Sequence, residues 1–127
     1  MRLKSSLVDL VEAGIAGNLP TEAQWDERKT VGIVLASKGY PETSSKDDVI
    51  YGLDTEMTDA KVFHAGTAVN ANGEIVTAGG RVLCVTALGN TIGEAQAKAL
   101  ELCEKVTFDG VQYRKDIGYR AIARENA

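Results

Sequence analysis

The first apolar residues of the chain recur at the spacing of one helix face. Leu3, Leu7, Leu10 and Val11 lie close to helical register, and Gly17 follows where the pattern stops. Charged residues interrupt the apolar positions, unlike the continuous apolar core of a signal peptide. The pattern predicts a short amphipathic helix whose apolar stripe must rest on another surface.

A polar connector over residues 21–28 separates this helix from a segment typical of β-strands. Trp25 is the only large apolar residue of the connector and is expected to anchor it. The β-branched run over residues 30–36 predicts a largely buried strand. Residues 49–53 predict a short second strand.

The middle of the chain has the pattern of a hairpin. Residues 61–69 and 74–78 are rich in strand formers and flank Asn72-Gly73, the dipeptide typical of a type I′ turn. The pattern therefore predicts two antiparallel strands joined by a two-residue loop.

That loop would set which residues of the hairpin face each other. Counting back from the turn places Gly66 opposite Gly79 and His64 opposite Arg81, so the stretches HAGT and AGGR converge. Glycine allows close backbone approach to a ligand, and the guanidinium fork matches phosphate or carboxylate. These residues indicate a small phosphate cradle. The alternative is that the glycines mark a β-bulge and Arg81 is a solvated residue at the sheet edge.

The segment after residue 90 predicts a second, better-defined helix. Thr91 and Glu94 have the spacing of a capping box, and Glu94 with Lys98 and Glu101 with Lys105 would form ion pairs one turn apart. One apolar stripe runs along the helix through Ile92, Ala95, Ala99, Leu102, Cys103 and Val106. The predicted role of this helix is packing.

The C-terminal tail is less regular. Residues 111–122 contain enough Val, Tyr and Ile to predict one or two strands. The triplet Arg114-Lys115-Asp116 is either a solvated bend or a contact with a partner domain. Two helices around β-rich segments predict an α+β domain.

Composition excludes several classes of function. A formal net charge of -4 argues against a general nucleic-acid binder, and no apolar run approaches the ~18 residues of a membrane span. Cys84 and Cys103 lie in apolar patterns without CxxC spacing, which indicates reduced cysteines in a cytoplasmic protein. With His64 as the single histidine, no metal ligand set or complete catalytic constellation is present.

Four longer stretches resemble a known family. GIVLASKGYP, VFHAGT, VTAGGRVLCVTALGNTIGEAQAKA and FDGVQYRKDIGYRAI look like the C-terminal domain of phosphoribosylamine–glycine ligase, also called glycinamide ribonucleotide synthetase. The resemblance covers almost the whole chain. It implies an ATP-grasp enzyme of de novo purine synthesis, which joins 5-phosphoribosylamine to glycine with ATP and magnesium.

The resemblance also implies an organisation. Residues 1–20 would be a helix at the end of the ATP-grasp region, and residues 21–127 the C-terminal domain, a small antiparallel sheet (a rudimentary barrel-sandwich hybrid) with flanking helices. ATP and magnesium would bind mainly in upstream portions that this sequence lacks. The chain alone is therefore expected to be inactive and to need the N-terminal and ATP-grasp portions as partners. Its first helix is expected either to mediate self-association or to show fast amide exchange.

By the same resemblance, the converging loops would face the 5-phosphate of phosphoribosylamine. The implied phosphate-binding residues are Gly66, Thr67, Gly79, Gly80 and Arg81, and the implied site-lining or domain-contact residues are His64, Arg114 and Lys115. The alternative is a stand-alone β-rich binding or interaction module without an enzymatic parent. The first helix separates the two hypotheses, because a self-sufficient module should bury its apolar stripe.

Overall fold

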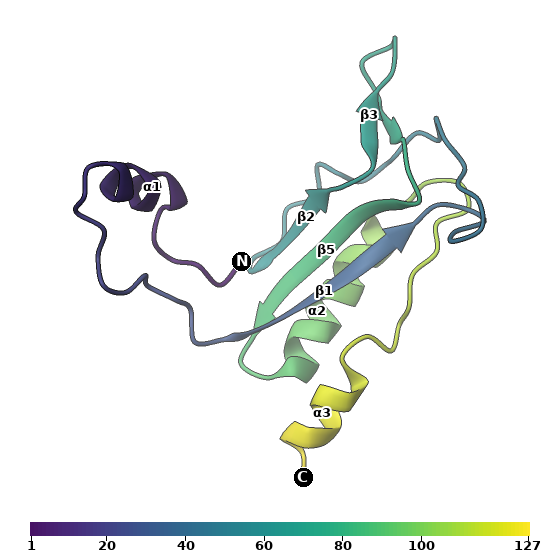
Figure 1. Cartoon of the computed structure of the whole chain (residues 1–127). Coiled ribbons are helices and arrows are strands. Elements are labelled where there is room, and N and C mark those ends of the chain that lie inside the picture. Colours follow the sequence, from purple (N-terminus) through teal and green to yellow (C-terminus); the bar gives the residue numbers. More distant parts are fainter.

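A computed structural model describes residues 1–127 and shows an open antiparallel sheet with a long helix across one face (Figure 1). The elements along the chain are α1 (Leu7–Ile15), β1 (Lys29–Ala36), β2 (Ala60–His64), β3 (Thr67–Val69), β4 (Ile75–Thr77), β5 (Arg81–Gly89), α2 (Ile92–Lys105) and α3 (Tyr119–Glu125). The predicted α+β class is confirmed. The strands form one three-stranded and one two-stranded sheet, and neither closes into a barrel.

The core lies between the three-stranded sheet and α2. The strand order is β1-β5-β2, with Ile33 and Val62 both paired to Val85 on the central strand. Because side chains alternate across a strand, every second residue of β1 and β5 faces α2. These positions and the apolar stripe of α2 are buried in one cluster, in which Leu102 packs against the sheet. The stripe predicted for this helix is therefore confirmed.

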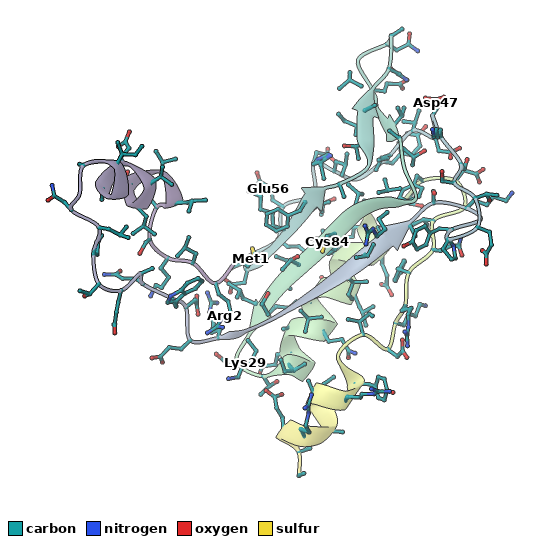
Figure 2. All side chains as sticks on the ribbon, in the orientation of Figure 1. Met1, Arg2, Lys29, Asp47, Glu56 and Cys84 are labelled. Atoms are coloured by element: carbon teal, nitrogen blue, oxygen red, sulfur yellow. The ribbon has the colours of Figure 1, made fainter.

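The opposite face of the three-stranded sheet has no helix over it (Figure 1). Val34 pairs with Cys84, which in turn pairs with Phe63, so the three residues form one row across the sheet. Val34 and Phe63 are exposed and Cys84 is half-buried near the middle of the sheet (Figure 2). Both cysteines are free, and burial raises the pKa of the Cys103 thiol to about 12.

At the start of α2 the Thr91 half of the predicted capping box forms, while Glu94 bonds the residue before Thr91, and one predicted ion pair is absent. Thr91 Oγ1 accepts from the Glu94 N–H at 3.1 Å, and the Glu94 carboxylate accepts from the Asn90 N–H at 2.8 Å. Since Glu94 turns back to the helix start, Lys98 lies 3.8 Å from Asp59 instead. The other predicted pair, between Lys105 and Glu101, is present at 3.1 Å.

The predicted hairpin is broken into two parts. The first half of its leading strand, β2, pairs with β5, while only β3 pairs with β4 in the ribbon at the top of Figure 1. The predicted register is wrong by one residue, because Val69 pairs with Ile75 and Asn70 with Glu74. The side chain of Asn70 accepts from the N–H groups of both Asn72 and Glu74, which stabilises a three-residue loop. Within the loop only Gly73 has a positive φ. A type I′ turn requires a positive φ at both central residues, so the loop is not of this type.

Two further strand predictions are wrong. Residues 49–53 form only isolated bridges, from Val49 to Val76 and from Tyr51 to Thr107, because neighbouring residues pair with different segments. In the tail, a single bridge joins Gln112 to Ala36 before the chain turns into α3. The residues preceding α3 pack on the core through side chains rather than through a strand ladder.

The N-terminal arm, residues 1–28, stands apart from the sheet. None of the α1 residues is buried, and the helix lies well to one side of the three-stranded sheet (Figure 1). Trp25 is bridged to Leu3 within the arm but is 58% exposed, so the expected anchor has no pocket in this chain. Arg2 donates to the Asp26 carbonyl at 3.0 Å, close to the start of β1 (Figure 2).

Candidate phosphate-binding site

The two glycine-containing loops meet in the structure, as the sequence predicts, although in a different register. The N–H groups of Ala65 and Gly66 both donate to the Val82 carbonyl at 3.0 Å, and the Ala78 N–H donates to the Gly66 carbonyl at 2.8 Å. His64 faces Leu83 rather than Arg81, which corrects the predicted pairing. The loops are thus held together by backbone hydrogen bonds.

Gly66 is required by this close approach. A Cβ atom added there would lie 2.6 Å from the Arg81 carbonyl oxygen and 3.1 Å from Gly79 Cα, closer than side-chain atoms pack. Because its N–H already donates within the chain, Gly66 contributes space rather than a free donor. The sequence therefore predicted that Gly66 lies where the two loops meet, and the structure shows that its role there is to allow their close approach.

Gly79 and Gly80 differ from Gly66, because their backbone N–H groups are free. The backbone N–H groups of Gly79 and Gly80 have no hydrogen-bond acceptor within the chain. Successive free N–H groups in a turn form the kind of concavity that binds anions. They directly precede Arg81, so two neutral donors and one cation are adjacent along the chain.

Arg81 also lacks an acidic partner. Two other arginines form ion pairs. Arg28 contacts Asp26 and Asp59 at 2.7 and 2.9 Å, and Arg114 contacts Asp116 at 2.7 Å. Arg81, at the start of β5, is exposed and makes no ion pair or side-chain hydrogen bond. Its guanidinium is free to bind an anion from outside the chain.

An open cavity of about 560 Å³ lies where the loops meet. Its lining consists of Tyr40, Ala65, Gly66, Gly80 and Arg81. Three of the five predicted phosphate-binding residues are therefore in one cavity. Gly79 is not among the lining residues but contacts Gly66.

The remaining predicted residues lie elsewhere. Thr67 Oγ1 lies 3.1 Å from His64 Nδ1, and His64 lines a separate cavity of about 630 Å³ beside β2. Arg114 lies in an apolar groove of about 430 Å³ on the other side of Arg81, and Lys115 is exposed in the turn. The hydrogen bond from Arg114 lowers the pKa of Asp116, so this cation is neutralised by its neighbour.

Tyr40 is the lining residue that the sequence analysis missed. It contributes to both the cavity and the groove. Its only sequence signal is its place in GIVLASKGYP, one of the stretches that carry the family resemblance.

The chain offers no ligand set for a metal ion. No three His, Cys, Asp or Glu side chains come together in the structure in a way that could hold one. None of the helices has the length and apolar character needed to cross a bilayer.

The fold defines an α+β domain, and comparison with known proteins assigns its family. Residues 30–120 match the family described as phosphoribosylglycinamide synthetase, C domain. Since the match covers well over half of the chain, the chain belongs to this family.

Individual relatives carry a more specific name. The phosphoribosylamine–glycine ligases of Pseudomonas aeruginosa and Yersinia pestis are 57% and 55% identical to the chain, each over 98% of its length. The chain spans 29% of the length of either relative. The crystal structure of phosphoribosylamine–glycine ligase from Thermotoga maritima matches with a TM-score of 0.66 and 40% identity, over 87% of this chain and 27% of that one.

Proposed function

We propose that this chain acts as the C-terminal part of a phosphoribosylamine–glycine ligase, in which it helps to bind the 5-phosphate of phosphoribosylamine. The observation that carries the proposal is that Gly80, with a free N–H group, and Arg81, with a free guanidinium, line one cavity, directly after Gly79 with its own free N–H group. A phosphate has several acceptor oxygens and negative charge, which match two amides and a planar cationic fork. Thr67 stays in the proposal as a neighbouring hydroxyl.

The nucleotide chemistry is assigned to the rest of the enzyme. In the complete ligase, ATP with magnesium would activate the glycine carboxylate for attack by the amine of phosphoribosylamine. The part that we assign to this chain's own residues is to hold the sugar phosphate, and no cluster of its His, Cys, Asp or Glu side chains could hold a metal ion. Both cysteines are free, which agrees with the cytoplasmic location that forms part of the proposal.

The exposed apolar surfaces support docking on the remaining portion of the enzyme. Leu7 and Ile15 on α1 are 65% and 85% exposed, and no other part of the chain buries them. A self-sufficient module should bury this stripe, so the helix favours the ligase over the stand-alone alternative. The boundary between a helix of the ATP-grasp region, residues 1–20, and the domain over 21–127 belongs to the same proposal.

Steady-state kinetics of the complete enzyme test the phosphate site. A hydrogen bond to a charged group contributes roughly 1.5–3 kcal/mol, so Arg81→Ala should weaken phosphoribosylamine binding about 10- to 150-fold. The glycine and ATP Michaelis constants should change little. Arg81→Lys should restore binding only in part, because an ammonium keeps the charge but loses the planar fork.

Arg124→Ala is the matched control, since Arg124 is exposed, unpaired and remote along the chain in α3. It should leave every constant unchanged. An unchanged phosphoribosylamine constant in Arg81→Ala, or loss of folding in that variant, would make Arg81 a structural edge residue.

Activity of the isolated chain tests the division of labour. The purified 127-residue protein should show no ATP turnover with glycine and phosphoribosylamine. Adding the N-terminal and ATP-grasp portions should restore turnover if the pieces dock. Measurable ligase activity from this chain alone would contradict the proposal.

A further inference from the structure

Tyr40 lies between two hollows that share Arg81. One is the open cavity at the glycine loops, and the other is the apolar groove bounded by Val34, Ile117 and Arg114. Tyr40 and Arg81 line both. The tyrosine is 39% exposed, so one side of it is available to a ligand.

The Tyr40 ring can pack against the backbone at Gly80 because this residue has no side chain. A Cβ atom on Gly80 would lie 2.5 Å from Tyr40 Cδ2 and 3.0 Å from Cε2. Such distances do not occur between packed carbons, so any larger residue at this position would displace the ring. Gly80 thus has two roles: its N–H group is free, and its lack of a side chain leaves room for the Tyr40 ring.

Backbone contacts tie the Tyr40 loop to the same place. The Ser37 N–H donates to the Gly80 carbonyl at 2.8 Å, and the Tyr40 N–H donates to the Ser37 carbonyl at 3.2 Å. The Gln112 side chain also donates to the Ser37 carbonyl, at 2.9 Å. Three segments distant in sequence therefore fix the position of Tyr40 beside Arg81.

We infer that Tyr40 is a further ligand-binding residue, which contacts the sugar while Arg81 and the glycine amides hold the phosphate. This inference rests on the proposed function. Binding sites for small molecules combine aromatic walls with a few oriented polar groups. The tyrosine ring and the apolar groove beside it match the carbon face of a pentose, and the phenolic hydroxyl can bond a sugar hydroxyl. Inorganic phosphate has no sugar, so its binding would need only the Arg81 guanidinium and the backbone amides of Gly79 and Gly80.

The difference between two probes tests this assignment. Binding of ribose 5-phosphate and of inorganic phosphate to the 127-residue chain can be followed by amide chemical shifts at millimolar concentrations. Tyr40→Ala should raise the dissociation constant for ribose 5-phosphate roughly 3- to 10-fold, the scale of an aromatic contact. It should leave the constant for inorganic phosphate within about twofold. Tyr40→Phe should show a smaller loss, because the ring remains.

Gly80→Ala provides a second route to the same result. It should reproduce the Tyr40→Ala loss for ribose 5-phosphate by displacing the ring. In a chain that already carries Tyr40→Ala, it should cost little more. Tyr51→Ala is the matched control, because Tyr51 is exposed and lines none of the three cavities.

Arg81→Ala separates failure of this inference from failure of the proposed function. If Arg81→Ala weakens both probes while Tyr40→Ala and Gly80→Ala weaken neither, or weaken both equally, the assignment of Tyr40 is overturned. If Arg81→Ala changes neither affinity, or the unmodified chain binds neither probe, the phosphate site itself is rejected. Amide spectra of each variant show whether the fold is retained, and Tyr40→Phe keeps the test open if Tyr40→Ala does not fold.

Discussion

The helices α1 and α2 are built from similar local signals but have opposite surroundings. Each has a side-chain cap, with Ser6 accepting from Asp9 in α1 and Thr91 accepting from Glu94 in α2, and each has an apolar stripe. The stripe of α2 is buried against the sheet, whereas α1 has no buried residue. The difference shows that capping and periodicity define a helix locally, while its stability depends on a packing surface.

A nine-residue helix without such a surface is marginal in water. The arm is therefore the part of this chain that most needs a partner, and the body formed by residues 29–127 is the part that can fold on its own core. Four measurements can break or sharpen this contrast.

Amide exchange should give the largest difference. Amides of α2 should exchange only through global unfolding, at a free energy of roughly 5–15 kcal/mol, while amides of α1 in the monomer should exchange almost freely. Self-association through α1 is the alternative that the exposed stripe allows, and it would slow exchange only at high protein concentration. A monomer in which α1 and α2 exchange equally slowly would contradict the contrast.

Truncation of one leucine in each helix should give the next largest difference. Leu102→Ala removes a side chain that is 1% exposed and should reduce the free energy of unfolding by about 2–5 kcal/mol. Leu7→Ala, the same substitution on the exposed stripe of α1, should change it by less than about 0.5 kcal/mol. Urea denaturation of both variants provides the measurement. Equal losses would mean that α1 is packed in solution.

Removal of the N-cap side chains should again destabilise the protein more in α2 than in α1, but the difference in the free energy of unfolding should be smaller. Thr91→Ala should cost about 1 kcal/mol, because the Glu94 N–H loses its acceptor in a helix that belongs to the cooperative core. Ser6→Ala removes the equivalent bond to the Asp9 N–H, at 3.2 Å, and should leave global unfolding unchanged. It should lower only the helicity of α1. A global effect of Ser6→Ala would show that the arm unfolds together with the body.

Acid should affect the junction between arm and body most weakly. Hydrogen bonds from Arg28 hold the pKa of Asp26 well below its usual range, and Arg28 also contacts Asp59 on the body. A carboxyl with a depressed folded pKa stabilises the fold above its unfolded pKa of about 4, and this contribution is lost as the pH falls toward the folded value. The protection of the amides of residues 26–28, taken relative to their intrinsic exchange rates at each pH, should therefore fall below about pH 4.

Asp26→Asn is the control for this effect, because an amide does not titrate in this range. The variant should show lower protection at neutral pH and little further loss of protection on acidification. If the unmodified chain and the variant respond equally to acid, other carboxyls control the junction.

Much of the candidate site was visible in the sequence. Gly66, Gly80 and Arg81 were placed together because a hairpin necessarily returns the chain to its starting edge, whatever its register. Tyr40 could not be placed in this way, since it is about forty residues from Gly80 along the chain. Its position depends on the hydrogen bond from Ser37 to the Gly80 carbonyl, which is a tertiary contact.

Elements governed by local chemistry were determined by the sequence itself. The β-branched run predicted over residues 30–36 is β1, and the capping residue Thr91 with its apolar stripe defined α2, because these signals act within a few residues. Where the apolar pattern left several structures open, competing local hydrogen bonds and tertiary contacts decided. Asn70 selected a three-residue loop over the type I′ turn, the tail ended in α3 rather than a strand, and Glu94 bonded the backbone instead of Lys98. Those choices depend on partners distant in sequence or on competing hydrogen bonds, and neither is encoded in the period of apolar residues.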